Sequence, residues 1–339
     1  MLTLPTELDR VRDDRPAYRP FRVSVRSVAR LSPSFLRVTF TGDELATFGR
    51  AGLDQRIKLL LPLEGDDAPR GFDHLGICEP AAIADGSWYE LWRAAPHHVR
   101  NPFRTYTVRA IRQHERELDV DFAVHGDGGP ASRWVRGARS GDELVIVGPD
   151  DASTGWRVGL DWQPGRRDEL LLVGDETAVP AVCAILESLQ PDVRARAFLE
   201  IPEAADALDV ALSCSDHVVT WLPRDDGARG ERLIAEVRAW ALAHRHVVAP
   251  ASVLRMPHAH GAASSSTEAM SPSPAESDGD SGLVWDSPAA ADEAGFYAWI
   301  AGETQTVVAL RRFLVKELGA DRSRVAFMGY WRQGRSELS

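Results

Sequence analysis

"GWRVGLDWQPGRRD", Gly155 to Asp168, separates two halves of the chain that have different hydrophobic patterns. The stretch is rich in glycine, proline and charge, a composition typical of connections between ordered segments. The chain has 339 residues, enough for about two domains of ordinary size. We therefore place one domain over residues 18–158 and a second over residues 166–337.

The half before this stretch contains short runs that are rich in β-branched or aromatic residues and end at Gly, Pro or Asp. The predicted strands cover residues 21–31, 34–42, 55–62, 87–94, 104–112, 117–125 and 142–149. Only Pro130–Ala138 has the pattern of a helix, with the proline at its first turn. Short strands with little helix between them predict an antiparallel barrel, which we expect to be of the Greek-key type.

The half after this stretch alternates strands with helices. The predicted strands are 168–174, 194–202, 216–224, 296–303 and 324–331, and the predicted helices are 176–189, 230–244 and 304–320. This alternation predicts a parallel sheet covered on both faces, an α/β domain. Residues 247–282 are biased toward Ser, Pro, Ala and Gly and cannot bury a core, so we expect a disordered insertion there.

Composition and charge exclude several classes of protein. The formal net charge of −11 argues against nucleic acid as a partner and requires a local basic cluster for any anionic ligand. No run approaches ~18 consecutive apolar residues, so no membrane insertion is expected. The N-terminus lacks the pattern of a secretory signal, and the three cysteines form no CxxC motif. We expect a cytoplasmic protein without a metal site of its own.

The stretch NPFRTYTVR, residues 101–109, places Arg104 and Tyr106 on one face of a predicted strand. An arginine offers a fork of donors to a phosphate, and a tyrosine offers a flat surface to an aromatic ring. Thr107 and the backbone of Val108 are placed to bond a polar ring edge. The alternative is an ordinary strand that faces solvent.

The stretch HGDGGPASRW, residues 125–134, fits the spacing of a dinucleotide fingerprint, with Asp150 as the acidic residue. The helix after Pro130 is too short for that motif, and the neighbouring strands have an antiparallel pattern, so we reject this reading. The better interpretation is a helix N-terminus whose glycines admit a phosphate, with Ser132 adding a hydroxyl. His125 faces a ligand ring in this interpretation, or is simply structural.

Five stretches occur in a fixed order: RTYTVR, DFAVHGDGGPASRW, GDETAVPA, FYAWIAGE and VAFMGYWRQGR. Together they resemble the siderophore-interacting protein family, the NAD(P)H-dependent ferric-siderophore reductases, which are similar in layout to ferredoxin–NADP reductases. The resemblance covers residues 18–245 and 283–337. It implies a flavin-binding barrel followed by an NAD(P)-binding domain.

The resemblance also implies site residues. Those at the FAD are Arg104, Tyr106, Thr107, Val108, Asp121, Phe122, Val124 and His125, with Gly129, Pro130, Ala131 and Ser132 at its pyrophosphate. Asp175, Thr177 and Ala178 lie near the adenosine portion, Gly302 and Glu303 at the nicotinamide nucleotide, and Tyr330 and Trp331 over the flavin. A basic pocket for the anionic siderophore is formed by Lys58, Arg332 and Arg335. Lys58, one of two lysines in the chain, should point away from its apolar neighbours Ile57 and Leu59, unless it is only an exposed strand lysine.

The implied reaction passes a hydride from NADH or NADPH to FAD and then single electrons to Fe(III) held in a siderophore. Such electron transfer needs no nucleophile and no protein metal ligand, so we expect no further catalytic residue. The expected substrate is a ferric siderophore and the expected state is a monomer. Two alternatives remain: a flavin or ferredoxin-type reductase with a protein acceptor, and a siderophore-binding protein without turnover.

Overall fold

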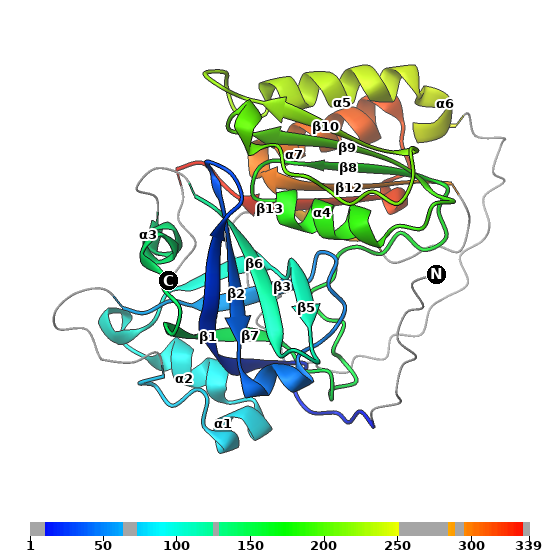
Figure 1. Cartoon of the computed structure of the whole chain (residues 1–339). Coiled ribbons are helices and arrows are strands. Elements are labelled where there is room, and N and C mark those ends of the chain that lie inside the picture. The colour runs from blue at the N-terminus through cyan, green and yellow to red at the C-terminus, as the bar shows by residue number, and fades with distance from the viewer. Residues whose placement is uncertain (1–10, 64–72, 125–128, 251–283, 289–294, 335–339) are drawn as a thin grey trace.

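The computed structural model describes residues 11–63, 73–124, 129–250, 284–288 and 295–334, which build two sheets (Figure 1). The first sheet contains β1 (Tyr18–Arg30), β2 (Phe35–Thr41), β3 (Arg56–Leu60), β4 (Phe103–Thr107), β5 (Ala110–Arg112), β6 (Glu117–Ala123) and β7 (Glu143–Pro149). Its order is β4-β3-β7-β1-β2-β6-β5, and every pair is antiparallel. Because β5 begins three residues after β4 ends, the two ends of this order are one stretch of chain, and the sheet curls into a barrel.

The barrel interior is filled by alternate residues of its strands, as the period of two requires. The fully buried side chains are Phe21, Val38, Phe40, Ile57, Leu59, Val120, Phe122 and Ile146. The helix α3 (Gly129–Gly137), which the sequence predicted almost to the residue, packs Ala131 and Val135 against this core. The antiparallel barrel expected from alternation is therefore confirmed.

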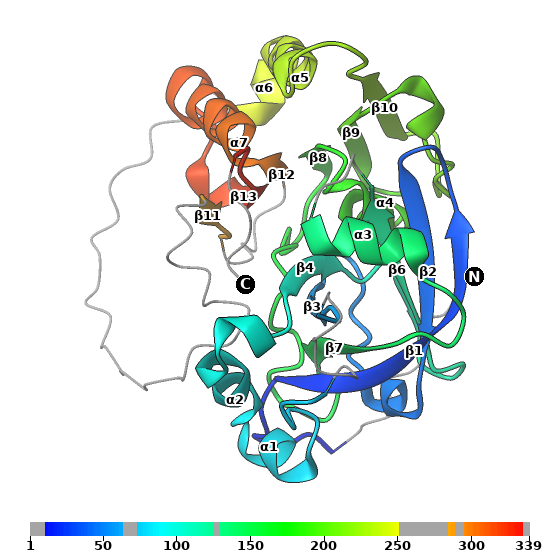
Figure 2. The same ribbon diagram turned by 90° about the vertical axis from the view of Figure 1, so that its left-hand side faces the viewer.

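The predicted strand 87–94 is wrong. These residues form the helix α2 (Trp88–Ala94), which follows α1 (Pro80–Asp85). Trp88 and Trp92 are four positions apart, so one helix face buries both indoles on the outside of the barrel. The ring of Trp92 lies 4.1 Å from that of Phe103. The aromatic content of this short run suggested a strand, but the spacing of four between the two tryptophans fits a helix. Both helices lie at the end of the barrel far from the α/β sheet (Figure 2).

The second sheet has the order β10-β9-β8-β12-β13-β11. Its parallel strands are β8 (Glu169–Gly174), β9 (Arg194–Ile201), β10 (His217–Pro223), β12 (Phe296–Glu303) and β13 (Val325–Trp331), and β11 (Trp285–Asp286) is an antiparallel edge. The helix α4 (Val179–Ser188) covers the face toward the barrel (Figure 1). The other face is covered by α5 (Glu231–Ala243) and by α7 (Thr304–Arg311), which continues as a π-helical turn, Arg312–Leu318.

Of the insertion predicted at 247–282, residues 247–248 belong to the short helix α6 (Arg245–Val248), and residues 251–282 lie outside the described part of the chain. None of the described helices is long and apolar enough to cross a membrane.

A chain of ion pairs joins the barrel to the α/β sheet. Arg37 of β2 donates to both carboxylate oxygens of Asp121 on β6, at 2.7 and 2.8 Å. Arg109 lies 3.5 Å from the same carboxylate and donates two hydrogen bonds to Glu187 of α4. Phe35 of β2 is fully buried in the core of the α/β sheet. The two sheets therefore share packed and charged contacts.

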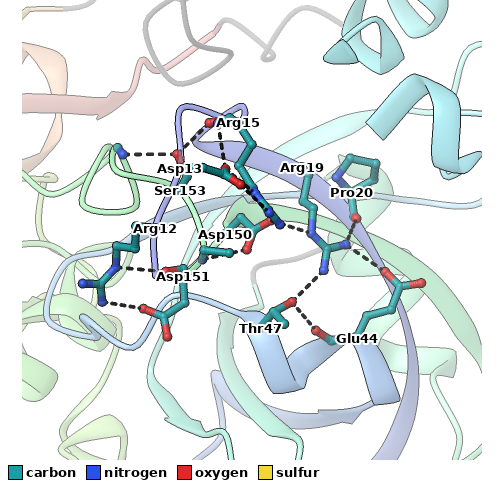
Figure 3. Close-up of polar contacts among 12 residues, drawn as sticks. Arg12, Asp13, Arg15, Arg19, Pro20, Glu44, Thr47, Asp150, Asp151 and Ser153 are labelled. Carbon is teal, nitrogen blue, oxygen red and sulfur yellow. Dashed lines mark hydrogen bonds and ion pairs between the residues drawn. The ribbon is translucent and has the colours of Figure 1, made fainter. Parts of the chain in front are cut away.

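A second network fastens the N-terminal segment to the barrel (Figure 3). Arg12 donates to the carbonyl and the carboxylate of Asp151, both at 3.0 Å. Arg19 pairs with Asp150 at 3.2 Å, and the hydroxyl of Ser153 donates to the carbonyl of Arg15. These contacts fix the start of β1, and none of them reaches the residues predicted for the site.

Candidate functional site

Several predicted site residues meet where the parallel strands end. The strand order changes direction between β8 and β12, and ligands of open α/β sheets bind outside the carboxyl ends of the strands at such a point. Asp175 follows β8, Gly302 and Glu303 end β12, and Trp331 ends β13. The sheet thus brings four predicted residues to one edge.

Asp175 is the hub of this edge. Its Oδ1 accepts the amide and the hydroxyl of Thr177, at 2.9 and 2.5 Å, and its Oδ2 accepts the amide of Glu303 and the indole N–H of Trp331, at 2.7 and 2.8 Å. Gly302 has φ 143°, and a Cβ there would lie 2.7 Å from Asp175 Oδ2. Burial and the neighbouring Glu176 carboxylate raise the pKa of Asp175 to about 6. The side chain packed against Gly302, which the resemblance places at the nicotinamide nucleotide, is therefore that of Asp175.

The two helices that start at this edge differ at their N-termini. The Glu303 carboxylate accepts the amides of Gln305 and Thr306, at 2.6 and 3.1 Å, so α7 is capped by an acidic side chain. Within the described residues, α4 has no side-chain cap, and its first residue follows the fully buried Ala178. The first turn of α4 is nevertheless buried and contains Pro180, which has no amide hydrogen, so Thr177, just before this helix, is the partly exposed residue of the turn.

Two arginines that the sequence analysis missed also lie at this edge. Arg224 follows β10 and pairs with Glu176 at 3.2 Å and with Glu200 at 3.0 Å, and Arg229 pairs with Glu176. The guanidinium of Arg229 lies 5.2 Å from the ring centre of Trp331. The signal was present in the printed sequence as an arginine, Arg224, at the end of a predicted strand, but its carboxylate partners come from two other strand ends.

On the barrel, the alternation of β4 separates the predicted residues onto two faces. Tyr106 packs on Phe122 with ring centres 4.5 Å apart, and Arg104, on the same face, donates to the carbonyl of Phe103 at 2.6 Å. Thr107 is buried on the opposite face. The amide of Val108 donates to Gln55 at 2.9 Å, so only the carbonyl of Val108 remains for the ring contact that the sequence suggested.

Lys58 lies on β3 directly opposite Thr105 of β4 and donates to its hydroxyl at 2.8 Å. Ile57 and Leu59 point into the barrel core. Lys58 therefore points away from both, as predicted, and lies on the opposite face of the strand pair from Arg104 and Tyr106.

The end of β6 and the start of α3 carry the remaining barrel residues. Phe122 lies inside the barrel and Asp121 in the ion pairs with Arg37 and Arg109, so these neighbours face opposite sides. The amide of Val124 donates to Ser34 at 2.8 Å. Pro130 and Ser132 are half-buried and Ala131 is buried. His125 lies outside the described residues.

The remaining predicted residues, Tyr330, Arg332 and Arg335, lie at or after the end of β13. Tyr330 stacks on Trp285, with ring centres 6.0 Å apart, and meets Trp299 edge-on at 6.1 Å. Burial raises the pKa of Tyr330 well above its usual value. Arg332 is half-buried directly after β13. Arg335 lies outside the described residues.

Comparison with known proteins decides the family. Residues 24–153 match the siderophore-interacting FAD-binding domain, and residues 167–334 match the siderophore-interacting protein model. The chain belongs to the siderophore-interacting protein family. It is 31% identical over 326 residues to an uncharacterized protein of Mycobacterium tuberculosis, covering 95% of this chain and 93% of that protein.

The chain is also similar to a named reductase and to a siderophore-interacting protein of known structure. Over 307 residues the chain is 28% identical to the ferric vibriobactin reductase ViuB of Vibrio cholerae, covering 91% of this chain and 87% of that protein. The crystal structure of the siderophore-interacting protein SipS from Aeromonas hydrophila matches with a TM-score of 0.59 and 27% identity, over 95% of this chain and 94% of that one. The barrel followed by a parallel α/β sheet is thus the architecture of the family.

The barrel of this siderophore-interacting protein fits a flavin dinucleotide. Gly129 begins α3 with φ 56°, and the space where a Cβ would stand has no atom of the described residues within 4 Å. A phosphate can approach the amides of this helix from that side. In the described part of the chain the Arg104 guanidinium makes a hydrogen bond only to Phe103, which leaves donors for a diphosphate.

Proposed function

We propose that this protein is a ferric-siderophore reductase that uses FAD and a reduced nicotinamide nucleotide. The observation that carries the proposal is the match of the barrel to a siderophore-interacting FAD-binding domain, in a chain related over 91% of its length to a ferric vibriobactin reductase. The carboxyl edge of a five-stranded parallel arrangement lies in the same described chain, where a dinucleotide is expected.

On the barrel side, Arg104 and the open N-terminus of α3 bind the diphosphate of FAD. Tyr106, held by Phe122, presents its ring to the isoalloxazine, and Thr107 and the Val108 carbonyl lie next to it along the strand. FAD accepts a hydride and releases its electrons one at a time, which is the chemistry the reaction needs. The remaining barrel residues proposed at the flavin are Asp121, Phe122, Val124, His125, Gly129, Pro130, Ala131 and Ser132.

On the sheet side, the nicotinamide nucleotide lies across the switch point between β8 and β12. Its phosphates lie over the turn between β8 and α4, because Glu303 occupies the first amides of α7. Asp175 holds Thr177, Glu303 and Trp331 in register and so fixes the walls of this crevice. Tyr330 and Trp331 cover the flavin from this side.

The ferric siderophore is the substrate and binds beside the flavin edge. Lys58 and Arg332 supply positive charge there, and Arg335 extends the same pocket. A local cluster is required because the net charge of −11 repels anions at long range. Iron stays in its chelator while it accepts an electron, so no protein ligand for the metal is needed.

We further propose that the protein acts as a monomer in the cytoplasm. The unpaired state of Cys78, Cys183 and Cys214 supports a reducing compartment.

The proposal is tested under anaerobic conditions with the purified, FAD-loaded protein. NADH or NADPH is added in stoichiometric amount, and the flavin absorbance is expected to bleach. Addition of a ferric siderophore with a ferrous-iron trap is then expected to restore the colour and to yield two Fe(II) per nicotinamide. A flavin that bleaches but is not reoxidised by any ferric chelate contradicts the assignment, and a flavin that never bleaches supports a binding protein without turnover.

A further inference from the structure

A pair of buried carboxylates lies at the junction of the two sheets, outside every predicted site. Asp54 precedes β3, and Asp161 belongs to the connection between β7 and β8. They are 0% and 5% exposed. The amide of Asp161 donates to Asp54 Oδ2 at 3.1 Å, which brings the two side chains into one cluster across 107 positions of sequence.

Each carboxylate is bonded through one oxygen to an indole of the α/β sheet. Trp299 of β12 donates to Asp54 Oδ2 at 2.9 Å, and Trp285 of β11 donates to Asp161 Oδ1 at 3.0 Å. Among the described residues, Asp54 Oδ1 and Asp161 Oδ2 are buried and accept no hydrogen bond. The same is true of the adjacent Gln55 Oε1. A buried acceptor without a donor is costly, so the cluster lacks at least one hydrogen.

The charges around the pair do not balance. The titratable groups that face it are Arg56 of β3, Tyr18 of β1, Tyr297 of β12 and Tyr330 of β13, with Arg167 beside Tyr297. Arg56 lies 3.3 Å from Asp161 Oδ2 and over the ring of Trp285. Two buried carboxylates against this one adjacent guanidinium leave one negative charge uncompensated.

A proton is the ligand that fits this deficit. No group of three or more metal-ligating side chains exists among the described residues, so the pair lacks the donors that a metal ion needs. One proton on the pair supplies one of the missing hydrogens and the missing positive charge. Burial, and next the Asp161 carboxylate, raise the pKa of Asp54 to about 7.

Neighbours of the pair contact residues of the proposed flavin site on both sheets. Arg56 is the cross-strand partner of Thr107, and the carbonyl of Gln55 accepts the amide of Val108. On the other side, Trp285 and Trp299 both pack on Tyr330. A change of charge at the flavin therefore acts on the carboxylates through a buried, water-poor region, where electrostatic interactions are strong.

We propose that Asp54 and Asp161 together hold one exchangeable proton and bind it more tightly when the flavin site is reduced. Transfer of a hydride into the crevice brings two electrons and one proton and leaves one additional negative charge there. The pair then takes up one proton from water. When the two electrons pass to two ferric ions, the hydride's proton and the stored proton both return to water, so the stored proton cancels over the cycle. The inference rests on the proposed function for its redox part only.

Infrared spectroscopy tests the proton site in the holoenzyme. Difference spectra between pH 6 and pH 8 should show, beside the band of Asp175, whose pKa is about 6, a second protonated carboxyl band in the wild type that Asp54→Asn abolishes. The matched control is Asp206→Asn, because Asp206 is also fully buried at the sheet junction but accepts from Ser32, Ser34 and Glu203. The control should keep this second band. A wild type without the second band, or a second band that survives in both Asp54→Asn and Asp161→Asn, overturns the proton site.

The midpoint potential of the flavin, measured against pH, tests the coupling. Above neutral pH the wild type and Asp206→Asn should show one more proton taken up per two electrons than Asp54→Asn. Equal slopes in all three overturn the coupling, even if the infrared band is present. If the purified protein binds no flavin, the proposed function fails, while the infrared titration still decides the proton site. Asp161→Asn replaces Asp54→Asn in both measurements if the latter does not fold.

Discussion

The barrel and the α/β sheet differ in how far the polar groups at their predicted cofactor sites are already satisfied; we call these two regions the barrel wall and the sheet wall. On the barrel wall, no atom of the described residues lies within 4 Å of the Cβ position at Gly129, and in the same part of the chain Arg104 makes a single hydrogen bond. On the sheet wall, Asp175 accepts four hydrogen bonds, Glu303 caps α7, and Arg224 is held by two carboxylates. The barrel wall therefore has hydrogen-bond donors available for an anion, whereas the polar groups of the sheet wall are bonded to one another.

This difference matches the two roles that a reductase needs. A cofactor that stays bound requires donors that are unsatisfied without it, since each then contributes to binding. A donor nucleotide that must leave after each turnover is better served by a wall that is stable when empty. We therefore expect tight binding of FAD and weak binding of the nicotinamide nucleotide.

The largest expected effect is a loss of stability when the hydrogen bonds of the sheet wall are removed. Asp175→Ala removes the acceptor of four hydrogen bonds and leaves the Trp331 indole and the Glu303 amide buried without partners. The free energy of unfolding should fall by about 3 kcal/mol in urea denaturation. Asp175→Asn keeps one acceptor oxygen and should lose less. A loss below about 1 kcal/mol for Asp175→Ala would show that this hub does not hold the wall together.

The next largest effect is a loss of FAD affinity when donors of the barrel wall are removed. Arg104→Ala removes the donors proposed for the FAD diphosphate, and a charge-assisted contact of this kind is worth about 2 kcal/mol. The dissociation constant of FAD, measured by fluorescence, should rise about 30-fold. Arg112→Ala is the control, because that guanidinium is paired with Glu117 and Asp119. Equal FAD affinity in both variants would remove Arg104 from the site.

A smaller effect concerns the junction between the walls and depends on pH. The pKa of Asp54 is raised to about 7, so the folded protein keeps a proton that the unfolded chain loses above pH ~4. Stability from this group is therefore present at low pH and is lost as the pH rises toward 7. Asp54→Asn should flatten this decline. At pH 8 its free energy of unfolding, measured by urea denaturation, should exceed that of the wild type by at least about 1 kcal/mol. A wild type whose stability does not fall between pH 5 and pH 8 relative to Asp54→Asn would contradict the raised pKa.

The smallest expected effect is a change in KM for the ferric siderophore when Lys58, proposed to bind it, is replaced. Lys58 is half-buried and hydrogen-bonded to Thr105, so its contact with an anionic chelate is partly screened. Lys58→Gln should raise the KM for a ferric siderophore by about twofold to fivefold and leave kcat unchanged. The other lysine of the chain provides the control, as Lys316→Gln on the far helical turn should change neither parameter.

Hydrophobic periodicity was enough to predict the barrel, the parallel sheet and α3, because alternation and the 3.6-residue period report which face is buried. It failed at residues 87–94, where Trp88 and Trp92 are compatible with either period. The family resemblance named Asp175, Glu303 and Trp331 only as separate ligand contacts. Their bonds to one another span 128 and 156 positions, and no local pattern encodes such pairs. The carboxylates Asp54 and Asp161 escaped for the same reason.

The most direct test compares the affinities of the two walls in one preparation. Titration calorimetry of the flavin-free protein with FAD, and of the FAD-loaded protein with NAD⁺ and NADP⁺, gives three dissociation constants. The account predicts that FAD binds at least about 100-fold more tightly than either nicotinamide nucleotide, a difference of ~2.7 kcal/mol. A dissociation constant of NAD⁺ or NADP⁺ equal to or lower than that of FAD would contradict this difference between the two walls.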